Sequence, residues 1–158
     1  MNLWTYLILL FSVFNFQSKT KVYYISPNGN DSNDGLSIKT AWKTIEKVNH
    51  TILKAGDMVL FEGGSSYSGN IQLDSLDNGT ARNPIIISSF GSKPAIIEAG
   101  EGRGFFAHNC EGIKVSKLSF HGDGIGKNKQ NGIEFYSDFA SKSLSFIKID
   151  SCEVKGFH

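Results

Sequence analysis

The chain has 158 residues, which predicts one domain that is long enough to bury a hydrophobic core. Its formal net charge is +1 and it contains no basic run, so electrostatic capture of a nucleic acid is not supported. The 17 glycines and only 3 prolines favour short strands joined by tight turns.

The first residues form a separate segment. A nearly unbroken apolar run extends from Leu3 to Phe16 and turns polar at Gln17. It is shorter than the roughly 20 residues that span a bilayer. We therefore predict a signal peptide over residues 1–18, export to the periplasm, cell surface or medium, and a folded domain over residues 19–158. The alternatives are a buried N-terminal strand and an uncleaved membrane anchor.

A strand and a turn-rich loop come next. Residues 21–26 are β-branched and aromatic in character, which favours a strand. Residues 28–35 consist almost entirely of turn formers. Their acidic and amide spacing has some likeness to a calcium loop, but counting from Asn30 the twelfth position is Ala41, where an EF-hand needs Glu. We interpret the segment as a turn.

One helix is predicted after this loop. Apolar residues recur at helical spacing with polar residues between them, at Trp42, Ile45, Val48 and Ile52. Thr40 is the predicted N-cap, and Gly56 lies near the expected C-terminal end. A single amphipathic helix at the start of a stack of strands would cover the exposed edge of that stack.

Short apolar or alternating runs fill the middle of the chain. Turn residues separate them, so each is predicted as a strand. The runs cover residues 58–61, 71–73, 84–90, 95–98, 104–107 and 133–135.

A repeat organises the last third of the chain. The segment from Ile113 to Gly122 returns 34 residues later as Ile147 to Gly156. In both copies apolar and polar residues alternate, two polar residues interrupt, and alternation resumes. Alternation is the strand period, and the interruption indicates a bend. The repeat predicts a solenoid whose coils stack, with Ile147 over Ile113.

The two cysteines are predicted to be unpaired. Cys152 falls at the position that Leu118 holds in the first copy, so it should point inward. The position 34 residues after Cys110 is Leu144, which puts the two thiols in different stacked columns. We interpret both as small buried hydrophobes, the alternative being a disulfide in an exported chain.

A longer pattern carries a resemblance to a known family. The segments are YYISPNGND at 23–31, NDGLS at 33–37, AWKTI at 41–45, AGDMVLF at 55–61, NPIII at 83–87, NGI at 131–133 and VKGF at 154–157. Together they resemble the start of secreted right-handed parallel β-helix proteins of the pectate-lyase-like superfamily. The likeness covers essentially everything after residue 18.

The resemblance implies a carbohydrate-active protein whose partner is a polysaccharide. Many relatives cleave uronate polymers by β-elimination, in which Asp-bound calcium neutralises the substrate carboxylate and a Lys or Arg removes the adjacent proton. Others are epimerases, hydrolases or non-catalytic surface modules. Asp123 and Asp150 are isolated here, so no catalytic residue is assigned. Calcium is expected only in a longer protein.

The end of the sequence predicts that the chain is part of something longer. Gly156, Phe157 and His158 follow a strand directly, without a closing helix. We expect the chain to be the N-terminal cap and first coils of a β-helix, with the remaining coils as its own partner. Alone, it would expose an open edge and aggregate.

Ligands of a parallel β-helix lie along one outer face, so outward residues of stacked coils are the candidate binding residues. His121 and Lys155 stack through the 34-residue offset and Asp123 follows closely, so the three are predicted to line a shallow groove for an acidic sugar. The alternative is that they are ordinary solvated positions at strand ends. The remaining histidines, His50, His108 and His158, have no partners at metal-ligand spacing, so we expect no metal in this segment.

Aromatic residues are a second candidate set. Five of them could stack on sugar rings: Tyr23, Tyr24, Trp42, Tyr67 and Tyr136. Trp42 is better explained as the anchor of the helix against the first coil.

The leading functional hypothesis is therefore an exported polysaccharide lyase-like enzyme that acts on uronate-containing polysaccharide, with this segment inactive by itself. The alternative is a non-catalytic β-helix module for surface attachment or glycan binding. A third hypothesis gives the segment a purely structural role.

Overall fold

Parallel pairing joins strands that are far apart in the sequence and builds three sheets. The computed structural model describes residues 19–140 and 143–158, so the predicted signal peptide lies outside the described residues. Every strand pair in the three sheets is parallel. Within the described ranges, no helix is long and apolar enough to cross a membrane.

Each sheet stacks strands from successive coils, so neighbours in a sheet come from neighbouring coils. Sheet I has the order β1 (Val22–Ile25), β2 (Met58–Glu62), β5 (Ile85–Phe90), β8 (Ile113–Ser116) and β11 (Ile147–Asp150). Sheet II has the order β10 (Ile133–Tyr136), β7 (Phe105–His108) and β4 (Ile71–Leu73). Sheet III has the order β12 (Glu153–Lys155), β9 (Leu118–Gly122), β6 (Ala95–Gly100) and β3 (Ser66–Ser68).

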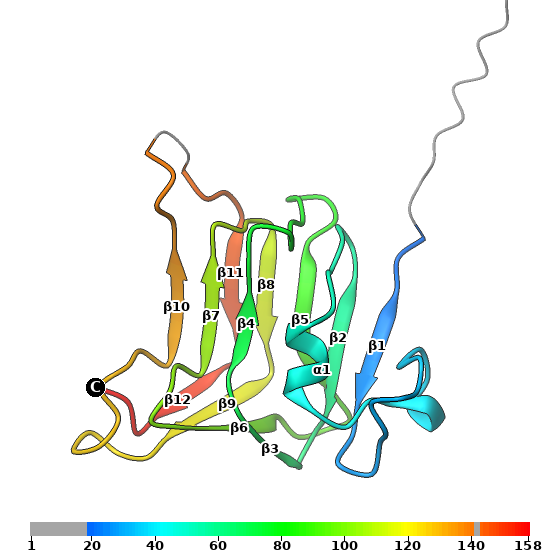
Figure 1. The fold of residues 1–158 in the computed structure, drawn as a ribbon, viewed down its shortest axis with the longest axis horizontal. Coiled ribbons are helices and arrows are strands. Elements are labelled where there is room, and N and C mark those ends of the chain that lie inside the picture. The colour runs from blue at the N-terminus through cyan, green and yellow to red at the C-terminus, as the bar shows by residue number, and fades with distance from the viewer. Residues whose placement is uncertain (1–18, 141–142) are drawn as a thin grey trace, which may run out of the picture.

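The chain visits sheets I, III and II in turn and then starts the next coil (Figure 1). This is the predicted right-handed parallel β-helix, in which crossovers between parallel strands take their usual hand.

The 34-residue repeat is confirmed as a stacking register. Ile147 pairs with Ile113, and Glu153 pairs with Ser119, which puts Cys152 alongside Leu118.

The predicted bend is a single residue in each copy. Lys117 and Ser151 both have φ of 53°, the left-handed conformation that turns the backbone from sheet I into sheet III.

The core fills the space that the three sheets enclose. Its largest fully buried side chains come from all three sheets and include Phe61, Phe105, Phe120, Ile25, Ile71, Ile85, Ile87, Ile97, Ile113 and Leu118. Burial of each such side chain contributes about 1.5–3 kcal/mol. In the last coil, Ile149 and Val154 occupy the columns of Val115 and Phe120, yet they are 49% and 47% exposed.

Both cysteines are free, as predicted. Cys110 is buried, and Cys152 is half-buried against the core.

The predicted helix is real but much shorter than expected. α1 spans Ile45–Asn49, and its N-cap is Thr44, whose side chain accepts a hydrogen bond from Lys47 N–H. The predicted cap, Thr40, instead ends a short 3-10 helix, η1 (Ile38–Thr40). Ile52 is exposed.

Trp42 explains why the helix starts late. Its backbone is extended, donating to the Tyr24 carbonyl and accepting from Ser26 N–H along the free edge of β1. Its ring is buried and stacks on Tyr23 at a centroid distance of 4.5 Å. Edge pairing therefore overrides the helical spacing, while the predicted role of Trp42 as an anchor at the cap is confirmed.

The loop over residues 28–35 is a turn, as interpreted. Asn30 Oδ1 accepts from Ser32 N–H, and Asp34 Oδ1 accepts from Leu36 N–H, so both side chains satisfy local backbone. Asp31 instead reaches forward to the helix start, where it accepts from the backbone N–H groups of Lys43 and Thr44.

The predicted capping role of the helix is also confirmed. α1 lies against β4, the first strand of sheet II (Figure 1). The Asn49 side-chain amide donates to the Asn70 carbonyl at 2.9 Å and accepts from Gln72 N–H at 3.0 Å. One side chain thus supplies the hydrogen bonds that a preceding strand would have made.

Candidate functional site

The outer face of sheet II carries a regular grid of side chains. Strand register places Phe106 between Gln72 on β4 and Glu134 on β10. His108, two residues further along β7, pairs with Tyr136 on β10. Side chains two residues apart on a strand share a face, so all of these project from the same surface.

Three rings on this face stand next to one another. Phe106 and His108 are nearly parallel, with centroids 6.0 Å apart and an interplanar angle of 11°. His108 and Tyr136 follow at 5.7 Å and 21°. Tyr136 is 51% exposed, so one end of this ring row is open to solvent.

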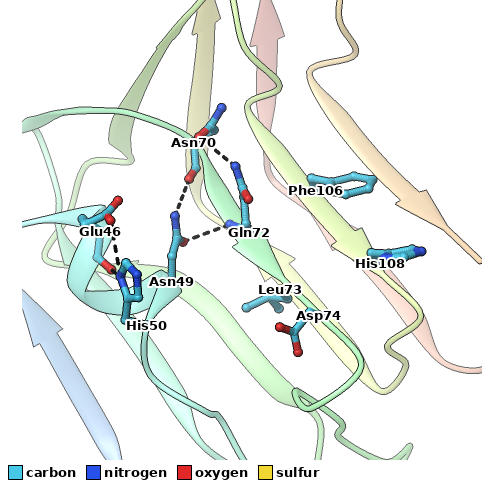
Figure 2. A pocket seen from close by; sticks show the side chains of 9 residues that line it. All are labelled: Glu46, Asn49, His50, Asn70, Gln72, Leu73, Asp74, Phe106 and His108. Atoms are coloured by element: carbon cyan, nitrogen blue, oxygen red, sulfur yellow. Dashed lines mark hydrogen bonds and ion pairs between the residues drawn. The ribbon is translucent and has the colours of Figure 1, made fainter.

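A pocket of about 460 Å³ lies between this row and the helix (Figure 2). Its lining comes from α1 and its flank, β4 and β7: Glu46, Asn49, His50, Asn70, Gln72, Leu73, Asp74, Phe106 and His108. The amides of Asn49, Asn70 and Gln72 are already connected by hydrogen bonds, as Figure 2 shows. They form a pre-arranged polar wall opposite the aromatic side.

Asp138 lies beside the ring row and is held in place by Asn109. Asn109 adopts a left-handed φ of 59° at the end of β7, and its Nδ2 donates to Asp138 Oδ1 at 2.7 Å. His108 Nε2 lies 3.2 Å from Asp138 Oδ2. The hydrogen bond from Asn109, with a smaller effect of His108, holds the pKa of the Asp138 carboxyl below its ordinary value.

An ion pair borders the opposite end of the row. Arg103 Nε donates to Glu134 Oε2 at 2.6 Å, and the Arg103 guanidinium lies over the Phe106 ring at 4.6 Å. Hydrogen bonds from Arg103 and Asn131 lower the pKa of Glu134. The charge of Arg103 is therefore largely matched by its own partner.

The predicted residues His121 and Lys155 are brought together, but on sheet III. They pair directly between β9 and β12 and line a second pocket of about 330 Å³. Asp123 is exposed and is not part of that lining; its N–H donates to the Gly100 carbonyl. Two carboxylates that sequence reasoning did not single out, Glu98 and Glu153, contact His121 and Lys155 respectively.

The predicted aromatic set is mostly structural. Tyr23 and Trp42 are buried, and the buried Tyr67 hydroxyl donates to the Ile25 carbonyl. Tyr24 makes an edge contact with Phe90. Tyr136 is the member of the set that lies in the ring row.

Sequence reasoning missed the other residues of the sheet II site. Its repeat signal was the 34-residue offset, whereas β7 and β10 are related by a 28-residue offset that aligns His108 with Tyr136. Aligning GFFAHN at 104–109 with GIEFYS at 132–137 would have found it.

Metal binding finds no support in either pocket. In residues 19–140 and 143–158, no group of three or more His, Cys, Asp or Glu side chains could hold a metal ion.

Stacked coils, three parallel sheets and one-residue bends define this chain as a parallel β-helix protein. No family model matches it. It is 31% identical over 140 residues to a lacto-N-biosidase of Bifidobacterium longum subsp. longum. This match covers 87% of this chain and 8% of that protein. The chain therefore spans only a small part of this relative.

Solved structures show the same fold. A GH136 lacto-N-biosidase from Eubacterium ramulus superposes with a TM-score of 0.72 and 21% identity, covering 85% of this chain and 27% of that one. A rhamnogalacturonan lyase superposes with a TM-score of 0.52 and 20% identity, covering 66% of this chain and 29% of that one.

Proposed function

We propose that this chain forms the N-terminal cap and first coils of an exported, carbohydrate-active β-helix protein that binds glycan on the outer face of sheet II. The observation that carries the proposal is the ring row of Phe106, His108 and Tyr136 beside an amide-lined pocket. The similarity to a protein named lacto-N-biosidase supports a glycan as ligand and favours a glycosidase over a lyase.

The chemistry of this face suits a sugar. Aromatic surface receives the apolar C–H face of a pyranose, and amides and carboxylates bond its hydroxyl groups. Strand register puts Gln72 next to Phe106, and the Gln72 side chain donates to Asn70 Oδ1, so both kinds of contact are available within one site.

The charge on this face favours a neutral glycan over a polyuronate. Carboxylates line the pocket at Glu46 and Asp74, and others lie beside the ring row at Asp138 and Glu134. The nearby guanidinium of Arg103 is paired with Glu134. A uronate chain would bring more negative charge to these carboxylates, which is unfavourable at close range.

The test is a binding comparison with purified protein. Neutral oligosaccharides containing galactose and N-acetylhexosamine are titrated against oligogalacturonate of similar length. We expect binding of the neutral set, weakened several-fold by Tyr136→Ala, and no stronger binding of oligogalacturonate. Ile38→Ala, which removes an exposed apolar side chain on η1, serves as the control. Equal binding by wild type and Tyr136→Ala would remove the sheet II site.

A second candidate remains the lyase-like action on uronate polysaccharide. It is favoured by the pairing of His121 with Lys155 in one pocket, where the Lys155 ammonium would face an acidic sugar; Asp123 lies outside that lining. Calcium would have to be held by further coils of a longer protein. Release of unsaturated uronate from pectate or alginate by that longer protein, with and without calcium, is the test. Absence of product on every uronate polymer would eliminate this candidate.

A further inference from the structure

A continuous line of polar contacts crosses sheet III on its outer face. Glu98 Oε1 lies 3.5 Å from His121 Nδ1, and His121 Nε2 lies 2.8 Å from Ser119 Oγ. Ser119 Oγ in turn lies 2.5 Å from Glu153 Oε2. Strand register fixes this order, because Glu98 pairs with His121 and Ser119 pairs with Glu153.

The order of the first three side chains in this line is that of an orienting acid, a general base and a serine nucleophile. A general base must face the hydroxyl with one ring nitrogen, while an acidic side chain orients the ring through the other nitrogen. Here Nε2 of His121 faces Ser119 and Nδ1 faces Glu98. We propose that Ser119, His121 and Glu98 form a site that cleaves small carboxylic esters, such as O-acyl groups on a glycan.

The surrounding pocket fits an acyl group next to the serine. Ile96 is the cross-strand neighbour of Ser119, and it lines the pocket of about 330 Å³ together with Pro94. Lys93 and Lys155 belong to the same lining. They would place positive charge near the oxyanion that forms when an ester carbonyl is attacked.

The steps balance without a further reactant besides water. Ser119 Oγ adds to the ester carbonyl carbon while its proton passes to His121 Nε2. The carbon–oxygen bond to the alcohol then breaks, and His121 protonates the leaving oxygen. Water attacks the acyl-serine and gives its proton to His121. The acid leaves, and the proton returns to Ser119.

Glu153 controls this site because it competes for the single Ser119 proton. A hydroxyl donates to one acceptor at a time, and the Glu153 carboxylate lies closer to Ser119 Oγ than His121 Nε2 does. Ser119 is also only 2% exposed. The Glu153 side chain is well exposed and can rotate away, which frees the hydroxyl. Its removal should therefore increase the reactivity of Ser119.

The test is covalent labelling by a fluorophosphonate probe, with the modified residue located by peptide mass spectrometry. We expect labelling at Ser119 in the wild type, at least several-fold faster labelling in Glu153→Ala, and loss of labelling in Ser119→Ala and His121→Gln. Ser66→Ala is the matched control, because Ser66 lies on the same outer row two strands away, outside this pocket.

Hydrolysis of 4-nitrophenyl acetate should follow the same order among the variants, and thermal melting of each variant shows that it is folded. The proposal is overturned if neither the wild type nor Glu153→Ala is labelled at Ser119. It is also overturned if His121→Gln labels as fast as the wild type. None of these outcomes depends on glycan binding by sheet II.

Discussion

The Asn49 side chain makes the hydrogen bonds to the backbone at Gln72 that a neighbouring strand would otherwise make. Its Oδ1 accepts from the Gln72 backbone N–H at 3.0 Å, while its Nδ2 donates to the Asn70 carbonyl. The free edge of sheet II is thereby closed by a side chain from α1, which fixes the helix against the first coil and forms one wall of the pocket.

Asn49→Ala should therefore destabilise the fold. It leaves the Asn70 carbonyl and the Gln72 N–H without the Asn49 side chain as partner, and we expect a loss of about 1–3 kcal/mol in the free energy of unfolding. Chemical denaturation measures it. Gln72→Ala is the control, because it keeps the backbone N–H and removes only the side-chain bond to Asn70. Equal stability of the two variants would show that the edge does not need Asn49.

Acid should loosen the cap through Asp31. Burial raises the pKa of the Asp31 carboxyl, but hydrogen bonds from the Thr44 hydroxyl and from the N–H groups of Lys43 and Thr44 outweigh this effect and hold the pKa below its ordinary value. A lowered folded-state pKa means that the carboxylate stabilises the fold above its ordinary pKa. This contribution is lost as the pH falls through the lowered value.

The melting temperature of Asp31→Asn should accordingly fall below that of the wild type at about pH 7, and the gap should close towards about pH 2. Thermal unfolding across the pH range measures it. A gap that stays constant with pH would mean that the Asp31 charge plays no part.

The exposed apolar residues of the last coil should drive self-association. Ile149→Lys places a charge on a half-exposed position and should reduce aggregation with little loss of stability. Val115→Lys changes the residue that pairs with Ile149 one coil earlier, and it should unfold the protein because Val115 is fully buried. Light scattering and circular dichroism separate the two outcomes.

The two thiols should react at very different rates. Burial, together with the nearby carboxylates of Asp77 and Asp74, raises the pKa of Cys110 to about 12. Burial also raises the pKa of Cys152, which is only half-buried. We expect iodoacetamide to modify Cys152 slowly and Cys110 only after unfolding. Fast modification of Cys110 in the folded protein would contradict its buried position.

Arg103 should matter for the ring row through packing as well as charge. Arg103→Lys keeps a cation but loses the planar contact with Phe106, so glycan affinity should fall although the charge is retained. Arg103→Ala should lower it at least as much. Calorimetric titration with the neutral oligosaccharide measures both, and unchanged affinity in both variants would exclude Arg103 from the site.

The repeat in the sequence was sufficient to predict the stacking of Ile113 with Ile147. Alternation indicates which side chains point inward, and the constant offset indicates which of them stack on one another. The helix was predicted too long because the helical spacing included Trp42. The backbone of Trp42 is instead hydrogen-bonded to the edge of β1. That pairing is a long-range effect that local periodicity does not contain.

The site was harder to predict than the core. His121 and Lys155 were brought together as expected, since the 34-residue offset sets their register. Phe106 and His108 were missed because residues that point outward carry no hydrophobic constraint. Their alignment with β10 uses a different coil length, because four residues connect β7 to β8 whereas ten connect β10 to β11.

The one-residue bends at Lys117 and Ser151 have an evolutionary implication. A corner that needs only a single backbone conformation leaves the side chains on either flank free to change. Substitutions can therefore accumulate on the outer face of one sheet, coil by coil, and create a new site without disturbing the core or the other two sheets.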